Sequence, residues 1–356
     1  MNPAVRQRAE ELFTLIGGLC SRPLSLMEVC GTHTMAISRF GLRRRFPPLL
    51  RLLSGPGCPV CVTPASLIDR LIAMSREPGV VIATFGDMVR VPGSSSSLEK
   101  ERARGAEVRV VYSPADALKM AEAEPQKLFV FMGVGFETTS PTVAATVMRA
   151  AEAKQKNFLV LPAFKLVPPA MEMLICGGGA RVDGFICPGH VSAIIGSEPY
   201  LPIVARRVPC VITGFEALDI LEGVVLLLKQ LAEGRSEVEI QYRRAVPAEG
   251  NRRARTLLEQ VFRPVDSEWR GIGVIPGSGL EFREEFSAFD ARRRIEVKRE
   301  EDGHKPEGCR CGEVMRGLIF PPDCPLFGAA CTPTDPVGPC MVSSEGACAA
   351  YYRYGG

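Results

Sequence analysis

The chain lacks the features of a membrane-spanning or nucleic-acid-binding protein. Its longest apolar runs, such as GVVLLLKQLA (223–232), are interrupted by charge and are too short to cross a bilayer. The N-terminal segment predicts a short amphipathic helix and has neither the apolar core nor the cleavage site of a signal peptide. The net charge is only +3 and the basic residues are dispersed, which gives no electrostatic reason for nucleic-acid binding. We therefore expect a cytoplasmic protein with no membrane or nucleic-acid partner.

Histidine is scarce in this sequence, whereas cysteine is abundant. The chain has three histidines and 13 cysteines. Because structural disulfides are rare in the cytoplasm, metal binding or redox chemistry is the leading explanation for so many thiols. Cys20, Cys176 and Cys210 lie in or beside apolar stretches and are expected to pack as small hydrophobic residues. Most of the others fall in two early motifs or in the last fifty residues.

Short apolar runs alternate with helical patterns up to about residue 232. This alternation predicts an α/β fold with parallel sheets that are covered on both faces. The length of 356 residues fits two such sheets better than one. The expected strands are 24–29, 80–85, 107–112, 127–134, 157–164, 182–187, 209–215 and 237–246. The expected helices are 63–77, 113–124, 140–154, 214–234 and 251–262.

Domain boundaries are expected near residues 125 and 234. They give a first α/β domain over 1–125, a second over 126–234, and a C-terminal region over 235–356. These boundaries are approximate, and the prediction allows the chain to cross from one domain to the other. The polar segment 93–105 is expected to be a surface loop, and the highly charged segment 290–308 a solvated linker.

The C-terminal tail has six cysteines in the pattern C-x-C-x12-C-x6-C-x8-C-x7-C and little apolar periodicity. Such a segment cannot hold its fold by burying apolar residues alone, so a bound metal cluster is expected to stabilise it. Four thiolates suit a [4Fe–4S] cluster. Structural zinc is disfavoured because its sites usually present close C-x2-4-C pairs, and the tail has no C-x2-C. Two cysteines remain over and could form a redox-active pair. We expect Cys309 and Cys340 to be that pair, with these cluster ligands: Cys311, Cys324, Cys331 and Cys348.

A second group of chemically competent residues lies in EVCGTHT (28–34) and GPGCPVCVTP (55–64). Cys30 and His33 follow an expected strand, at the edge where ligands gather in open α/β sheets. Cys58 and Cys61 form a C-x2-C before a helix-start signal, where thiolates are favoured and a disulfide is permitted. Alone, this pair would equally fit a metal-free thioredoxin-like dithiol. Together with this pair, the Cys30 thiol and the His33 imidazole favour a soft metal site for iron or zinc.

Two more motifs lie at expected strand ends, GVGFETT (133–139) and CPGH (187–190). The first has the glycines of a phosphate loop but lacks its lysine, so nucleotide binding is not expected. Glu137, Thr138 and His190 add polar and titratable groups to apolar surroundings. We expect Glu137 and His190 to line, from the second domain, the cleft at whose mouth the central cysteines converge.

These five motifs, in this order, resemble the signature set of the HypD family of [NiFe]-hydrogenase maturation proteins. The resemblance covers about residue 24 to the C-terminus. It implies two Rossmann-like domains plus a small iron–sulfur domain whose cluster surroundings are likened to ferredoxin:thioredoxin reductase. It also implies that Cys30, Cys58 and Cys61 are tied to iron, in a scaffold on which the Fe(CN)2CO group is built.

The resemblance implies partners as well: a small HypC-type chaperone that shares the scaffold and a HypE-type protein that donates cyanide. In this hypothesis the tail cluster supplies electrons, and groups such as His33, Glu137 and His190 offer protons or hydrogen bonds to incoming ligands. Two alternatives remain open. One is a stand-alone thiol–disulfide oxidoreductase that uses Cys58 and Cys61; the other is a structural zinc protein.

Overall fold

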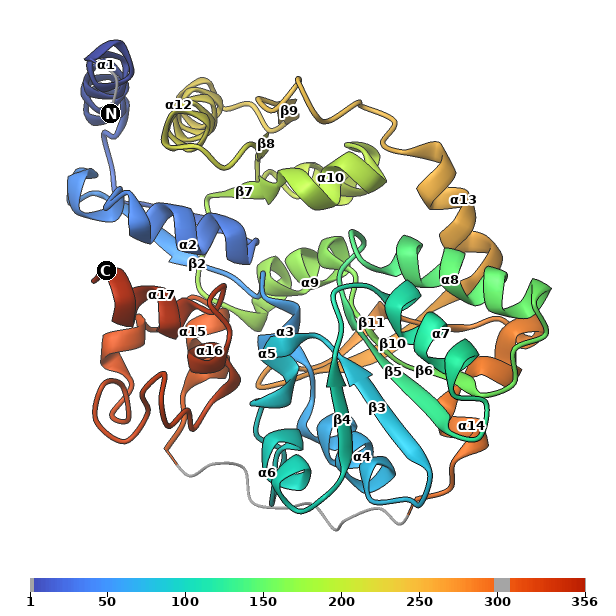
Figure 1. The fold of residues 1–356 in the computed structure, drawn as a ribbon. Coiled ribbons are helices and arrows are strands. Elements are labelled where there is room, and N and C mark those ends of the chain that lie inside the picture. Colours follow the sequence, from blue (N-terminus) through green and yellow to red (C-terminus); the bar gives the residue numbers. More distant parts are fainter. Residues whose placement is uncertain (1–2, 298–307, 356) are drawn as a thin grey trace.

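Two parallel β-sheets form the framework of the molecule, which we describe from a computed structural model for residues 3–297 and 308–355 (Figure 1). The first sheet has five strands, in the order β2 (Leu50–Ser54), β1 (Leu24–Glu28), β7 (Gly184–Pro188), β8 (Cys210–Thr213) and β9 (Val238–Ile240). The second has four, in the order β4 (Glu107–Val110), β3 (Val80–Thr84), β5 (Leu128–Gly135) and β6 (Phe158–Phe164). All of these pairings are parallel, which confirms the expected Rossmann-like α/β class.

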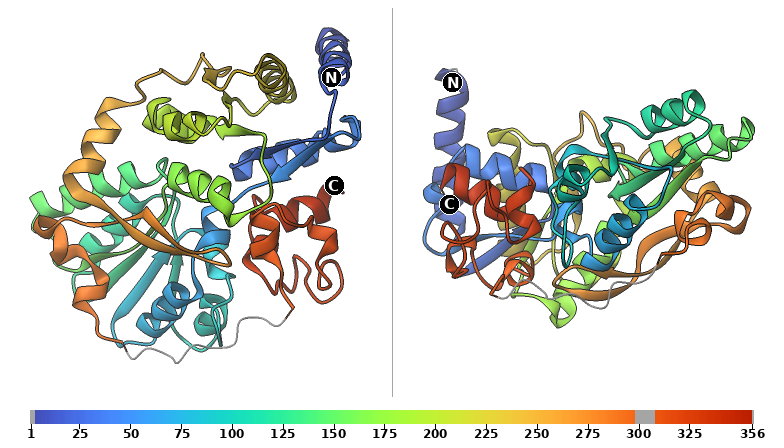
Figure 2. Two further views of the ribbon diagram at one scale, coloured as in Figure 1. Left: turned by 180° about the vertical axis from the view of Figure 1, so that it is seen from behind. Right: turned by 60° about the horizontal axis from the view of Figure 1, so that its bottom comes forward.

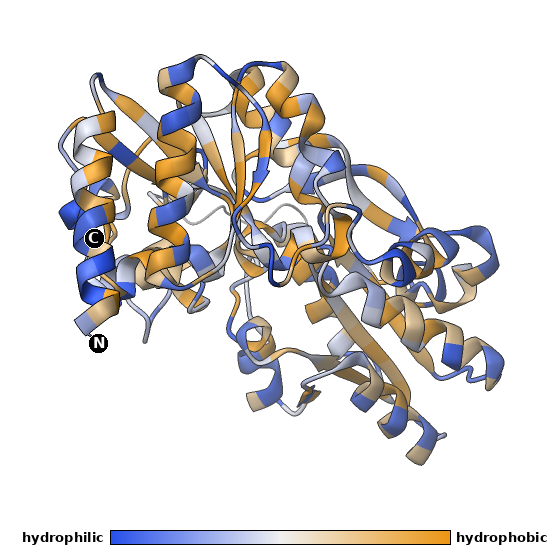
Figure 3. Cartoon of the chain, turned by 90° about the horizontal axis from the view of Figure 1, so that it is seen from above, coloured by the Kyte–Doolittle hydropathy of each residue, from blue (hydrophilic) through white to orange (hydrophobic). Residues whose placement is uncertain are grey.

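Helices cover both sheets, as the continuous apolar strands require. Hydrophobic strands lie between helices that are polar on their outer faces (Figure 3). The helices around the five-stranded sheet are α1 (Pro3–Leu19), α2 (Gly31–Arg39), α10 (Gly189–Ile195), α11 (Leu201–Ala205) and α12 (Ala217–Glu233). Those around the four-stranded sheet are α3 (Pro59–Val62), α4 (Ala65–Ser75), α5 (Gly86–Val89), α6 (Leu98–Ala103), α7 (Pro114–Ala123), α8 (Ser140–Glu152) and α14 (Ala291–Arg294). Connecting helices are α9 (Val167–Met173) and α13 (Arg252–Val261).

The chain crosses between the sheets, so the expected boundary near residue 125 does not divide them. That residue falls between β4 and β5, and both strands pair with β3 in the same sheet. The five-stranded sheet takes two strands from the first expected domain and the others from beyond residue 180. The sheet membership of each strand depends on long-range pairing, which local periodicity does not encode.

Four further segments differ from expectation. The strand β2 was not expected, and neither was the antiparallel hairpin of β10 (Phe262–Trp269) and β11 (Gly273–Phe282). The segment 93–105 is not a plain surface loop, since it contains α6 and buries Leu98 and Glu101. The expected charged linker, 290–308, begins with the short helix α14. Its residues 298–307 lie outside the described part of the chain.

The C-terminal tail packs against the first sheet and its connections. It contains the short helices α15 (Cys311–Met315), α16 (Pro339–Val342) and α17 (Ala347–Tyr354). The tail, drawn in red, lies beside the N-terminal region in both views of Figure 2, and α17 contacts α2 while α16 contacts α3. One continuous hydrophobic core includes residues of β1, α3, the hairpin and the tail cysteines. In the described ranges, no helix is long and apolar enough to span a membrane.

Candidate functional site

The carboxyl ends of four neighbouring strands bring together most of the predicted site residues. Cys30 follows β1, the CPVC segment follows β2, His190 follows β7, and Phe215 follows β8. Because these strands are parallel, their carboxyl ends share one edge of the sheet. His190 therefore belongs to the same sheet as Cys30, and the expectation that it comes from a second α/β domain is wrong.

Cys30 is the N-cap residue of α2 and is buried. The buried Glu28 carboxylate shapes this turn by accepting hydrogen bonds from the Cys30 backbone N–H, at 3.1 Å, and from the Thr34 hydroxyl, at 2.6 Å. Burial raises the pKa of the Cys30 thiol to about 12, although backbone N–H groups at the start of α2 oppose the shift. Burial also raises the pKa of Glu28 to about 7. Cys30 is thus a protonated thiol until a cation compensates its charge.

The CPVC segment lies directly against Cys30. The Gly31 N–H donates to the Gly57 carbonyl at 2.7 Å, and a side chain at Gly57 would collide with the Cys30 backbone. The short helix α3 begins just after Cys58, whose sulfur accepts from the Cys61 N–H at 3.2 Å. Cys58 and Cys61 form a disulfide, as their spacing permits. Both are buried.

The two histidines flank one aromatic ring. Phe215 stacks on His190 with ring centroids 3.9 Å apart, and its distance to His33 is 4.6 Å. His33 is fully buried, and its Nε2 lies 2.9 Å from both the Gly214 carbonyl oxygen and the Thr213 hydroxyl. Burial lowers the pKa of His33 to about 4, so the ring is neutral at pH 7. His33 therefore fastens α2 to the end of β8, and its Nδ1 has no hydrogen-bond partner among the described residues.

A carboxylate from the tail, Glu345, completes this site. Its Oε1 accepts from the Thr32 hydroxyl at 2.8 Å, and its side chain packs on Gly31. The negative charge raises the pKa of both Cys30 and His190, although burial contributes more to the Cys30 shift and leaves the His190 pKa lowered overall. Glu345 is more than 300 residues from Thr32 in sequence. No local pattern pointed to Glu345 or to Phe215, whereas Glu28 lies in the EVCGTHT motif without having been expected to act there.

The GFETT segment lies at the end of β5, in the other sheet. Glu137 is buried, accepts from the Val167 N–H at 2.9 Å through Oε1, and leaves Oε2 without a partner in the described residues. Burial raises the pKa of Glu137 to about 7. Its neighbour Phe136 shares a core with Cys58 and Cys61, whereas the hydrogen bonds that the Glu137 carboxylate accepts in the described residues come from backbone N–H groups. Thr138 is exposed.

All six tail cysteines line one small cavity of about 10 Å³, with apolar neighbours such as Phe327 and Met341. The thiols of Cys309 and Cys311 are in contact, as are those of Cys311 and Cys340. Contact with Cys311 and then burial raise the pKa of Cys309 far above its ordinary value. Thiols gathered around a dry space, with few other partners, form a donor set that suits an iron–sulfur cluster. The residues therefore fit this cofactor.

The tail cavity is joined to the central site through α16. The Cys61 sulfur lies 3.9 Å from the carbonyl oxygen of Pro339, the residue before Cys340. Within the described residues no three His, Cys, Asp or Glu side chains converge to hold a single metal ion. The disulfide explains this at the central site, since it occupies both sulfurs of the C-x2-C. Reduction must therefore precede any metal binding there.

Cysteines outside these groups divide in their surroundings. Cys20 and Cys210 are buried, as expected for small hydrophobic residues, but Cys176 is exposed and that expectation is wrong.

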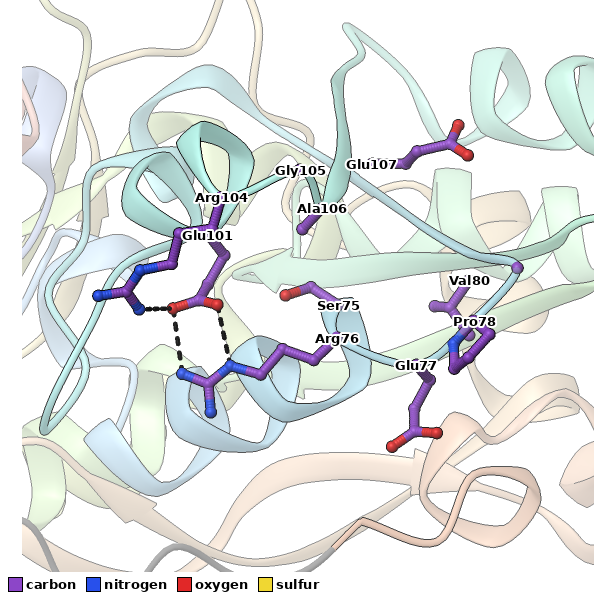
Figure 4. Close-up of a pocket in the computed structure, with 11 residues that line it drawn as sticks. Ser75, Arg76, Glu77, Pro78, Val80, Glu101, Arg104, Gly105, Ala106 and Glu107 are labelled. Atoms are coloured by element: carbon purple, nitrogen blue, oxygen red, sulfur yellow. Dashed lines mark hydrogen bonds and ion pairs between the residues drawn. The ribbon is translucent and has the colours of Figure 1, made fainter.

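A separate polar pocket lies where β3 and β4 of the four-stranded sheet begin (Figure 4). There Arg76 and Arg104 hold Glu101 in ion pairs, which lower the pKa of Glu101 to about 2. The paired charges indicate a structural role for this pocket.

The fold and site define a class: an α/β protein with a buried thiol site at a sheet edge and a cysteine-lined C-terminal cavity. The model of one family, described as "HypD: Hydrogenase formation hypA family", matches residues 5–355. The chain is 48% identical to the hydrogenase expression/formation protein HupD of Azotobacter chroococcum, over 94% of this chain and 90% of that protein. It is 44% identical to the hydrogenase maturation factor HypD of Escherichia coli, over 98% and 93% of the two chains. This chain belongs to the HypD family of hydrogenase maturation factors.

Proposed function

We propose that this protein is the scaffold on which the Fe(CN)2CO group of [NiFe] hydrogenase is assembled. The observation that carries the proposal is the backbone contact of Gly57, the residue before CPVC, with the Cys30 turn, since both cysteine motifs lie at the same sheet edge. Three soft sulfur donors suit an iron ion that must hold cyanide and CO. The iron is cargo in this proposal, shared with a small HypC-type partner, and cyanide arrives from a HypE-type protein.

Iron loading requires chemistry from the chain itself. The Cys58–Cys61 disulfide must take up two electrons and two protons to give two thiols. Cys30, Cys58 and Cys61 must then lose their protons to bind iron as thiolates, so loading releases protons and weakens as pH falls. His33 stays neutral and fixes α2, and hence Cys30, against β8.

A resident [4Fe–4S] cluster in the tail would supply single electrons when bound. The thiol contacts favour one change from our expected ligand set. Cys311 touches both Cys309 and Cys340, whereas no contact between the Cys309 and Cys340 thiols is found in the described part of the chain, and Cys340 follows Pro339, which lies beside Cys61. We therefore assign Cys311 and Cys340 as the spare pair. The ligands in this assignment are Cys309, Cys324, Cys331 and Cys348. The approach of Cys61 to Pro339 supports α16 as the connection between the two thiol sites.

The second candidate function is that of a stand-alone thiol–disulfide oxidoreductase, which the Cys58–Cys61 disulfide favours. Anaerobic purification with the small partner, followed by iron analysis and infrared spectroscopy, separates the two. The scaffold proposal predicts iron beyond the cluster and bands in the cyanide and CO stretching region. A complex with no such bands, but with catalytic disulfide exchange, would support the oxidoreductase instead.

A further inference from the structure

A cleft of about 410 Å³ opens beside the tail cavity, between the β10–β11 turn, the start of α4 and the tail. Cys309 and Cys311 line both the cleft and the cysteine cavity, so these residues form the wall between them. Cys309 is the most exposed of the six tail cysteines, since the other five are buried. Any cluster held in the cavity therefore comes nearest to solvent at this cleft.

Two arginines give the cleft a positive potential. The Arg270 guanidinium donates to the Pro92 carbonyl at 3.0 Å and Arg316 to the Gly312 carbonyl at 3.2 Å. Neither arginine forms an ion pair among the described residues, and the nearby Glu313 carboxylate, on which the Arg316 charge also acts, is held by Arg310 instead. The single carboxylate in the described lining is Glu268, which leaves a net positive charge.

The walls of the cleft are fixed by a close backbone contact. Gly271, in the β10–β11 turn, has a φ of +74°, and a side chain there would meet Gly312 Cα at 2.7 Å. Only glycine at both positions allows the turn to seat on α15. The cleft is therefore preformed, and its arginines are held in place on two interlocked segments.

We propose that this cleft is the docking site for an acidic one-electron carrier protein, such as a small ferredoxin, that reduces the tail cluster. The inference rests on the proposed function and names a further partner for it. Electron-transfer encounters are small and weak, and complementary charge guides them. With a cluster bound, the reduced carrier would lose one electron and the cluster would gain it, so the exchange would balance without any bond or proton moving.

Charge reversal at Arg316 tests the proposal, because this side chain lines the cleft, is partly exposed and donates to the Gly312 carbonyl rather than to a cysteine. We would reconstitute the full chain anaerobically and mix it with a reduced, acidic [2Fe–2S] ferredoxin in stopped flow. At low salt, Arg316→Glu should slow cluster reduction about tenfold and weaken ferredoxin binding in a titration, because it replaces attraction by repulsion. Salt should slow the wild-type reaction as it screens the charges. Reduction by dithionite should be unchanged.

Two variants serve as controls. Arg316→Lys keeps the charge and should retain most of the rate. Arg149→Glu makes the same charge change on α8, at an exposed ion pair with Glu122, and should have little effect. Equal rates and affinities for wild type and Arg316→Glu would overturn the docking proposal, as would an equal loss in Arg149→Glu.

The same experiments distinguish failure of the proposed function from failure of the docking proposal. If the wild type acquires no cluster, its visible spectrum shows this before any mixing. Ferredoxin binding to the cluster-free chain then tests the cleft by itself. A loss of that binding in Arg316→Glu, but not in Arg149→Glu, would still support the docking site, and equal binding would reject it.

Discussion

The central cysteines and the tail cysteines reach their positions by different means. Cys30 and Cys58 lie where strands end, so the parallel sheet fixes them through regular backbone pairing. The tail cysteines lie in short helices and turns around a cavity, where their own side chains supply much of the packing. The first site has a framework that persists without metal. The second buries apolar residues such as Val314 and Met341 but is built from short helices and turns, so a bound cluster should add to its stability.

The largest expected effect separates a shared iron site from a simple dithiol. Cys30→Ala, Cys58→Ala and Cys61→Ala should each abolish hydrogenase maturation, because an iron centre cannot replace a lost thiolate with water. Maturation in a strain that lacks the native gene measures this. Cys176→Ala is the matched control, since Cys176 is exposed and belongs to neither cysteine group, and it should retain activity. Substantial activity in Cys30→Ala would favour the dithiol enzyme.

Removal of a predicted cluster ligand tests how far the tail site, unlike the central site, depends on bound metal. Cys348→Ala should lose the brown colour and the cluster's iron, about four atoms per chain in the wild type. It should also loosen the tail, which limited proteolysis can detect. The central variants should keep their cluster because the sheet edge does not depend on it. A Cys348→Ala protein with the full visible spectrum would remove Cys348 from the ligand set.

The sequence predicted the parallel sheets and the strand-end motifs because both follow local rules: buried runs of β-branched residues, and glycine-flanked cysteines after them. It missed β2, whose five residues include an exposed arginine. It also placed His190 in the wrong sheet, because strand order is set by pairing between distant segments. Glu345 could not be found from any local signal, since its contact with Thr32 exists only after the tail has docked.

A smaller effect concerns the buried carboxyl of Glu137. Its pKa in the folded protein, about 7, is above the ordinary 4.5, so this group favours folding below pH 4.5 and the contribution is lost as pH rises to 7. Glu137→Gln should therefore gain at most about 3 kcal/mol in the free energy of unfolding near pH 7 and nothing near pH 4. Urea titrations at both pH values measure this. An equal change at both would mean that ionisation of Glu137 is not the cause.

The smallest effect tests the seating of CPVC on Cys30. Gly57→Ala introduces a methyl group against the Cys30 backbone, and we expect a loss of about 1–3 kcal/mol in the free energy of unfolding. The same substitution at Gly17, in α1, meets no neighbouring atom and should be neutral or slightly stabilising. Thermal unfolding of both variants provides the comparison. A tolerated Gly57→Ala would show that the two motifs are not held as closely as the structure indicates.

The most direct test of the shared iron site is infrared spectroscopy of wild-type and Cys30→Ala proteins, each purified anaerobically with the small partner from cells that supply cyanide. The account predicts cyanide and CO stretching bands in the wild type and none in Cys30→Ala, while both keep the visible absorption of the tail cluster. Undiminished bands in the folded Cys30→Ala protein would contradict the assignment of Cys30 to the iron.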